Sequence, residues 1–215
     1  MNSESHQKMP KGLVLFYTTQ LISRLSVAIW IPITAVFVIA LGGTVLTLGE
    51  LSVIFGVVYS VSAYFISKLG HKHRYKLLPI SYGLAIIYAI ALCLINSPDQ
   101  LYAAILFGGL STSLRASSLK AVALDFIDKK QFIIYQQKQR MFGSFIAAIA
   151  GYIGARIIHH SGSPNPHLSH DYEAFHLIFY TMIALKLGVF ALSLIFYKRY
   201  KSNVLAKTSS QVAEH

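Results

Sequence analysis

The chain has 215 residues, of which 54% are hydrophobic and only 13% are charged, and its formal net charge is +11. Soluble domains usually carry about 25% charged residues, so this composition excludes an ordinary soluble globular protein. The basic residues flank apolar segments and form no continuous stripe, which argues against nucleic acid as a partner and for the lipid bilayer.

Six apolar runs follow one another, at residues 12–40, 45–67, 77–95, 100–119, 140–158 and 174–197. Each run is close to the roughly 20 residues that a helix needs to cross about 30 Å of hydrocarbon. None has the polar–apolar alternation of a membrane β-strand. In lipid only helices and closed barrels satisfy their backbone groups. The runs therefore predict an all-α membrane protein with six transmembrane helices in one domain, residues 12–198.

The first run, 12–40, is predicted to be a permanent helix. It is longer than the apolar region of a signal peptide, and no small-residue cleavage site follows it. Pro32 removes a backbone hydrogen bond to the carbonyl of Ala28, so a kink is expected there. Such kinks lie beside transport pathways but are also common in plain membrane helices, and both interpretations stay open.

The links at 41–44 and 96–100 are short, so the runs that each one joins are expected to be antiparallel neighbours. The link after 100–119 carries apolar residues among charged ones over 121–139, which predicts an amphipathic extension of that helix. The fifth run has small residues at four-residue spacing that predict close approach of a second helix. These are Gly143, Ala147, Gly151 and Ala155, widened by Gly154.

Basic residues outside the runs gather at alternate links and at both ends of the chain. They are Lys8, Lys11, Lys68, Lys72, Arg74, Lys76, Lys120, Lys129, Lys130, Lys138, Arg140, Lys198, Arg199, Lys201 and Lys207. The links 41–44, 96–100 and 161–173 carry none. The positive-inside rule then makes residues 1–11 and 199–215 cytoplasmic tails of a multi-pass protein in a cell membrane (inner or plasma).

Basic residues also occur inside the runs. Arg24 lies about twelve residues into the first run, roughly 18 Å from its inner end at 1.5 Å per residue. A guanidinium at that depth costs at least about 2.5 kcal/mol unless it meets water or a partner, so Arg24 is expected to face the bundle interior or a cavity. Arginine also pairs bidentately with carboxylate or phosphate groups.

Arg115 lies nearer the inner end of the fourth run, where it either extends to the interface or faces the same cavity as Arg24. Arg156, near the outer end of its run, is expected to reach the interface. Lys186 is at mid-run, and the sequence gives it no role. No Asp or Glu lies at mid-depth. Because proton-coupled transporters usually carry embedded carboxylates, this pattern favours an anionic solute over proton symport.

Other chemistry is poorly supported. Cys93 is the single cysteine, so no internal disulfide is possible. His167, His170 and Asp171 have weak spacing for zinc, and no metal site is expected. The chain has no His-Glu-x-x-His, nucleotide-binding glycine loop or Ser/His/Asp grouping, so we expect neither an enzyme nor a cofactor.

Three segments carry a family resemblance. The link from Ala63 to Lys72 resembles the Gly-x-x-x-Asp-Arg-x-Gly-Arg-Arg loop of the major facilitator superfamily: Lys68 stands for the first arginine and Gly70 matches, while Ser67 replaces the aspartate. Asp125 followed by basic residues before a glycine-rich run is similar to the family's layout. Residues 147–155 are similar to the antiporter motif, but Tyr152 replaces its diagnostic proline, so no antiporter is predicted.

The resemblance covers roughly residues 12–198 and implies the amino-terminal six-helix half of the major facilitator fold. Members have two such halves related by an axis along the membrane normal, so it implies a second six-helix half or a homodimer as partner. Lys186 would then mark a pairing surface or a departure from the family layout. The resemblance implies two residue sets, for substrate binding Tyr17, Gln20, Arg24, Tyr59 and Arg115, and for gating Lys68, Gly70, Lys72 and Asp125.

Two functions are compatible with these features. The first is a secondary transporter, or half of one, that moves a small anionic solute by alternating access. The alternative is a non-transporting or truncated membrane subunit that needs a partner half.

Overall fold

The computed structural model of the protein describes residues 11–69, 76–126, 129–160 and 172–213, and over these ranges regular structure is entirely helical. The elements are α1 (Lys11–Trp30), the short 3₁₀-helix η1 (Ile31–Ile33), α2 (Thr34–Ala40), α3 (Val45–Ser67), α5 (Leu77–Leu94), α6 (Pro98–Phe126), α7 (Lys129–His160) and α8 (Tyr172–Ala213).

Each predicted apolar run is helical in the structure. Four segments of the described chain are long and apolar enough to cross a membrane: Leu15–Ala40, Val45–Ser67, Leu77–Leu94 and Phe175–Lys198. Helices α6 and α7 are not among these candidates, although they pack alongside them. Polar residues over 111–118 lower the hydropathy of α6, and glutamines and basic residues over 136–140 do the same for α7.

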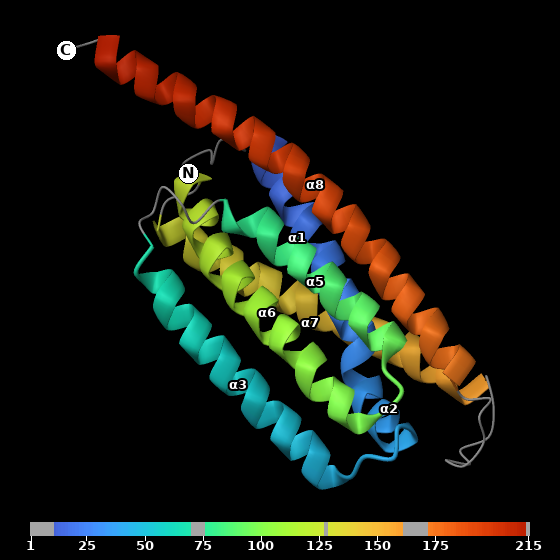
Figure 1. Ribbon diagram of the computed structural model, residues 1–215. Helices are drawn as coiled ribbons and strands as arrows, with labels where there is room; N and C mark the ends of the chain where they lie inside the picture. The colour runs from blue at the N-terminus through green and yellow to red at the C-terminus, as the bar shows by residue number, and fades with distance from the viewer. Residues whose placement is uncertain (1–10, 70–75, 127–128, 161–171, 214–215) are drawn as a thin grey trace.

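The helices run back and forth along one long axis (Figure 1). The start of α1 and the far end of α8 lie at the same end of the bundle, together with the ends of α3 and α6 and the starts of α5 and α7. The tight turns α2–α3 and α5–α6 lie at the opposite end. The cytoplasmic placement of both termini stays a prediction.

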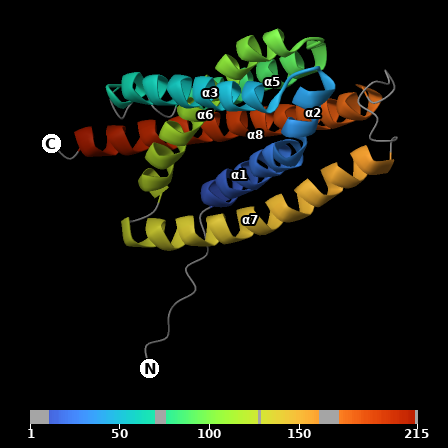
Figure 2. The same cartoon turned by 90° about the horizontal axis from the view of Figure 1, so that it is seen from below.

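The main helix contacts form an open row in the order α3, α6, α5, α8, α1, α7. Figure 2 shows α7 beside α1, away from α3. The short link 96–100 does join neighbours, α5 and α6. The link 41–44 joins α2 to α3 only at the turn, since α3 then leans on α6 rather than on α1. This divergence leaves space between α1 and α3.

The predicted kink at Pro32 is confirmed, because the α-helix stops at Trp30 and gives way to η1 before α2 begins. The backbone N–H of Thr34 bonds to the carbonyl of Ile31 rather than to that of Trp30. The hydroxyl of Thr34 donates to the Trp30 carbonyl at 3.2 Å and so replaces the missing backbone donor. The carbonyl of Trp30 therefore keeps a hydrogen-bond partner across the break.

The small-residue stripe of α7 packs on α1 and η1, as the spacing predicts. A Cβ added at Gly154 would lie 2.9 Å from the carbonyl oxygen of Ile29 and 2.9 Å from Cδ1 of Ile33. Gly151 faces the ring of Pro32 in the same way, at 3.4 Å. These glycines let α7 approach the α1 backbone where the helix is broken.

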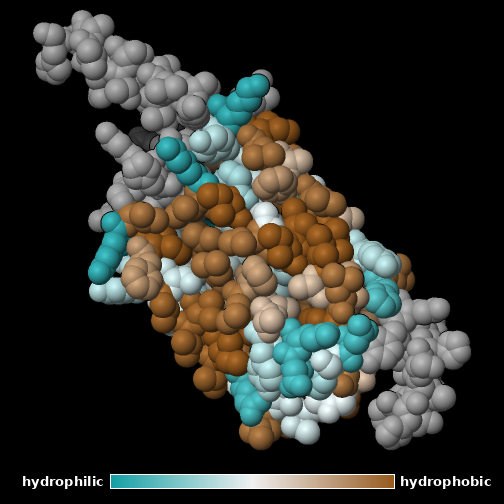
Figure 3. Space-filling view, in the orientation of Figure 1, coloured by the Kyte–Doolittle hydropathy of each residue, from teal (hydrophilic) through white to brown (hydrophobic). Residues whose placement is uncertain are grey.

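An aromatic cluster packs the C-terminal part of α1 and the helix α2 against α8. Phe37 meets Phe179 and Phe175 with ring centroids 5.0 and 5.1 Å apart, and Trp30 meets Phe179 at 5.1 Å. Tilted and edge-on pairs of this kind are favourable beyond their buried area. Figure 3 shows that apolar side chains cover much of this face of the molecule. Val53 and Val57 of α3 and Ile87 of α5 are among the exposed large hydrophobic residues.

The contact at Gly154 generates a stability prediction. Gly154→Ala inserts a methyl group 2.9 Å from backbone and is expected to lower the free energy of unfolding by about 1–3 kcal/mol through overpacking. Gly188→Ala on α8, where a Cβ would meet nothing within 4 Å, is the matched control. Thermal unfolding in detergent should show a lower midpoint for the first variant alone. Equal midpoints would contradict the close α1–α7 contact.

Candidate functional site

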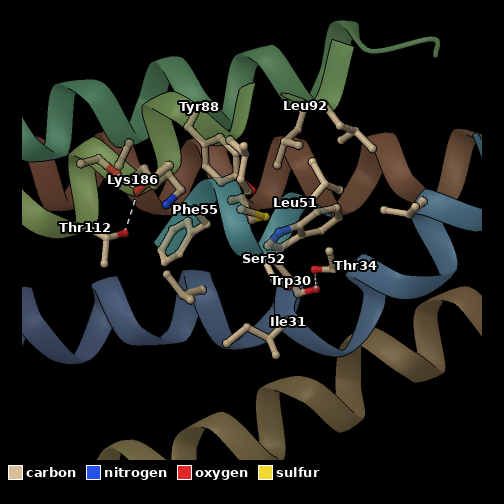
Figure 4. Close-up of a pocket in the computed structure, with 18 of the residues that line it drawn as sticks. Trp30, Ile31, Thr34, Leu51, Ser52, Phe55, Tyr88, Leu92, Thr112 and Lys186 are labelled. Atoms are coloured by element: carbon tan, nitrogen blue, oxygen red, sulfur yellow. Dashed lines mark hydrogen bonds between the residues drawn. The ribbon is translucent and has the colours of Figure 1, made fainter. Parts of the chain in front are cut away.

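A cavity of about 460 Å³ opens inside the bundle between α1, α3, α5, α6 and α8 (Figure 4). It begins beside the α1 break, where Trp30, Ile31 and Thr34 line it, and runs toward Lys186 and Thr112. The space exists because α3 departs from α1 after the α2–α3 turn. This volume lies in the range of about 300–1,000 Å³ that is usual for small-molecule sites.

Two cationic side chains line one end of the cavity, Arg115 from α6 and Lys186 from α8. Lys186 is only 5% exposed and lies near the middle of the Phe175–Lys198 segment. Among the described residues its ammonium group has no hydrogen-bond or ion-pair partner. The two positive charges repel each other. Each charge therefore makes burial of the other less favourable, and both charges need water or an anion in the cavity.

Arg115 is held in place by α1. Its Nη1 donates to Oγ of Ser23 at 2.8 Å. Beside this bond Nε2 of Gln20 donates to the hydroxyl of Tyr82 at 2.9 Å, and Tyr82 lies close to both Ser23 and Arg115. The bond to Ser23 uses one of the five guanidinium donors. The others remain available at the cavity.

Hydroxyl groups supply the remaining polar lining. Thr112 and Ser111 donate to the carbonyl of Gly108 at 2.8 and 3.0 Å, and Ser52 donates to that of Leu48 at 2.9 Å. Their protons are committed to backbone carbonyls of their own helices, so these hydroxyl groups can offer a solute only acceptor oxygens. Positive donors come only from Arg115 and Lys186.

No carboxylate among the described side chains neutralises these cations. The described acidic side chains are Glu50 and Asp99, and both are exposed. The hydroxyl of Tyr102 donates to Glu50, which ties the start of α6 to the start of α3. The cavity is therefore electropositive with respect to the described residues.

Arg24, the sharpest candidate from sequence, lies outside the cavity lining and against α7. Its Nη1 donates to the carbonyl of Gln139 at 3.1 Å. Gly143 makes room for it, since a Cβ at that position would clash with Nη1 of Arg24. The small-residue stripe and the embedded arginine thus meet at one contact. The charge of Arg24 still acts on Arg115.

The other predicted residues have varied positions. Gln20 is buried and bonded to Tyr82, Tyr17 is half-buried against the core around Phe16, and Tyr59 stacks on Phe55 with centroids 6.4 Å apart. None of the three lines the cavity.

Of the predicted gating residues, Lys68 is exposed at the end of α3, with Nζ 4.4 Å from the centre of the Tyr64 ring. Gly70 and Lys72 lie outside the described residues, as does the side chain of Asp125 in α6. The histidines at 167 and 170 also lie outside them. Over the described chain no group of three or more His, Cys, Asp or Glu residues is placed to hold a metal ion.

Several lining residues were not predicted from the sequence. Ser52 and Phe55 of α3 line the cavity, whereas the predicted Tyr59 lies one turn further along the same helix. Thr112 precedes Arg115 by three residues and so shares its helix face, which the 3.6-residue period alone predicts. Lys186 was noted at mid-run without a role, because sequence periodicity does not say which neighbour a helix face meets.

The arrangement as a whole combines a cationic end with an apolar wall. Beyond Arg115 and Lys186 the lining is largely aromatic and aliphatic, with Trp30, Phe55 and Leu92 as examples. Such a site can bind an anion by charge and by hydrogen bonds while its wall excludes bulk water. The lining residues include no carboxylate and no histidine that could act as a general base, so the arrangement favours binding over bond-breaking.

Comparison with known proteins agrees with this architecture. A search of curated proteins finds no match to the chain. Residues 16–213 match the family described as Major Facilitator Superfamily. The matched region includes every helix that lines the cavity. This family consists of transporter-type membrane proteins rather than enzymes, with the lipid bilayer and a solute as partners. Because the match covers most of the chain, the protein belongs to the Major Facilitator Superfamily.

Proposed function

We propose that the protein is a secondary transporter, or half of one, that carries a small anionic solute by alternating access. The observation that carries the proposal is the pair of cations at one end of the cavity, Arg115 and Lys186, with no carboxylate among the described side chains to neutralise them. A charged side chain at the bilayer centre costs roughly 2.5–3.5 kcal/mol on insertion scales. A solute anion would offset this cost.

Arg115 is the residue for which geometry and sequence agree. It is anchored by Ser23 on α1 and keeps further donors for the solute. Lys186 would approach the same anion from α8, and Arg24 would add positive potential from the α7 side. Gln20 would act through Tyr82 rather than by contact with the solute, and Tyr17 and Tyr59 would support the surrounding helices.

In this proposal all six long helical segments cross the membrane, with both ends in the cytoplasm. Helices α6 and α7 would tolerate their polar residues because these face the cavity or neighbouring helices. A second six-helix unit, either a second copy or a separate half, would face the open side of the row between α3 and α7. Residues Lys68, Gly70, Lys72 and Asp125 would form the latch at the cytoplasmic gate.

Removing the charge of Lys186 tests the function. Lys186→Met keeps the side-chain volume and is expected to reduce counterflow of anions in liposomes to background. The same variant should gain about 1–3 kcal/mol of stability, because it removes an uncompensated buried charge. For a protein of this size that is a rise in thermal midpoint of roughly 2–4 °C per kcal/mol.

Lys198→Met is the matched control, since Lys198 lies exposed on the same helix at the end of its apolar segment. It should leave both transport and stability near the parent values. Anion counterflow that persists in Lys186→Met would refute the proposed role of the cation. Liposomes that show no transport of any solute with the parent chain would instead favour the non-transporting subunit.

The proposed topology predicts side-specific labelling. In a Cys93→Ala background, Lys68→Cys should react with a membrane-impermeant maleimide only from the cytoplasmic side, and Asp99→Cys only from the outer side. Both positions are exposed and lie at opposite ends of the bundle. Labelling of both cysteines from one side would overturn the alternation of the crossings.

A further inference from the structure

The cavity is divided along its length into a cationic end and a hydrophobic remainder. In Figure 4, Lys186 and Thr112 lie at one end, Phe55 and Tyr88 lie in the middle, and Leu51, Leu92 and Trp30 lie toward the other end. The hydroxyl groups of Thr34 and Ser52, which lie toward that end, donate to the backbone carbonyls of Trp30 and Leu48. A solute that fills the space must therefore match two different surroundings.

A small hydrophilic anion matches only one of them. It would occupy the Arg115–Lys186 end and leave the aromatic and aliphatic lining in contact with ordered water. Burial of apolar surface gives favourable free energy in proportion to area, and this solute would gain none of it. Its affinity would also be insensitive to the aromatic side chains, although these make up much of the lining.

Resting on the proposed anion transport, we infer that the solute is an amphipathic organic anion, with its acidic group at Arg115 and Lys186 and its aromatic or aliphatic body along Phe55, Tyr88 and Leu92. A carboxylate attached to a ring by a short chain has this shape. A volume of about 460 Å³ holds such a molecule. Met182, one turn before Lys186 on α8, also lines the cavity. Its flexible side chain can adapt to solutes whose apolar parts differ in shape.

The chain carries its own reporter for this inference. Trp30 is the single tryptophan, and it lines the cavity near the α1 break. A solute that fills the hydrophobic end changes the surroundings of the indole and hence its fluorescence. An anion held only at the cationic end should change this fluorescence only weakly. The binding of such an anion is therefore measured in parallel by calorimetry.

The experiment titrates the full chain in lipid nanodiscs with phenylbutyrate, phenylbutyramide, acetate and inorganic phosphate. Phenylbutyrate is expected to change Trp30 fluorescence with a Kd at least about tenfold below that of acetate or phosphate, a difference equal to about 1.4 kcal/mol. The neutral amide should bind about tenfold more weakly than the acid. Lys186→Met should remove that preference for the acid.

The apolar wall is tested separately with Phe55→Ala, which should weaken phenylbutyrate binding about tenfold and leave acetate binding unchanged. Phe65→Ala is the matched control, because Phe65 lies on the same helix but is 62% exposed and does not line the cavity. It should behave as the parent.

The outcomes separate the two proposals. Acetate or phosphate binding as tightly as phenylbutyrate, with no effect of Phe55→Ala, would overturn the amphipathic class and keep anion transport. Amide and acid binding equally would overturn the placement of the acidic group at the cations. Absence of any Lys186-dependent anion binding would overturn the proposed function itself.

Discussion

An uncompensated cation in the hydrophobic interior is the constraint on which this structure depends. Lys186 is buried at the middle of a segment apolar enough to cross a membrane, and Arg115 lies nearby with the same sign of charge. Neither charge is tolerable against hydrocarbon, since the cost is several kcal/mol for each group. The helices must therefore leave a space that water or an anion can occupy. The open row of helices, with α3 displaced from α1, provides it.

The space is maintained by tight packing elsewhere. On one side of α1 the glycines of α7 contact the broken helix near Pro32, and on another Phe37 and Phe179 fix α1 and α2 to α8. These contacts hold α1 from two directions and leave its remaining face open toward α3. Trp30 and Ile31 line the cavity at the break, and the hydroxyl of Thr34 donates to the Trp30 carbonyl. The same local feature thus limits packing and shapes the site.

Much of this fold could be predicted from apolar periodicity, because run lengths and turn residues determine where membrane helices begin and end. The predicted run 45–67 coincides with α3, and the kink at Pro32 follows from a missing N–H group. Helix neighbours were harder to predict, because a short link fixes proximity only at the turn. The site was predicted in part. Arg115 lines the cavity, but Arg24 reaches a carbonyl of α7 through the gap left by Gly143.

Arg24 and Lys186 are both embedded cations, but only Lys186 depends on the contents of the cavity for a partner. Arg24 has a backbone carbonyl as partner and a glycine that accommodates it, so its position is stable whether or not a solute is present. Lys186 has no such partner among the described residues, so its free energy depends on what fills the cavity. In the proposed mechanism, closing the empty cavity away from water is therefore costly, because Lys186 would be left without a partner. A bound anion shifts the equilibrium between the open and the closed cavity by the difference between its affinities for these two states. A loaded carrier would then reorient more readily than an empty one, as the proposed alternating access requires.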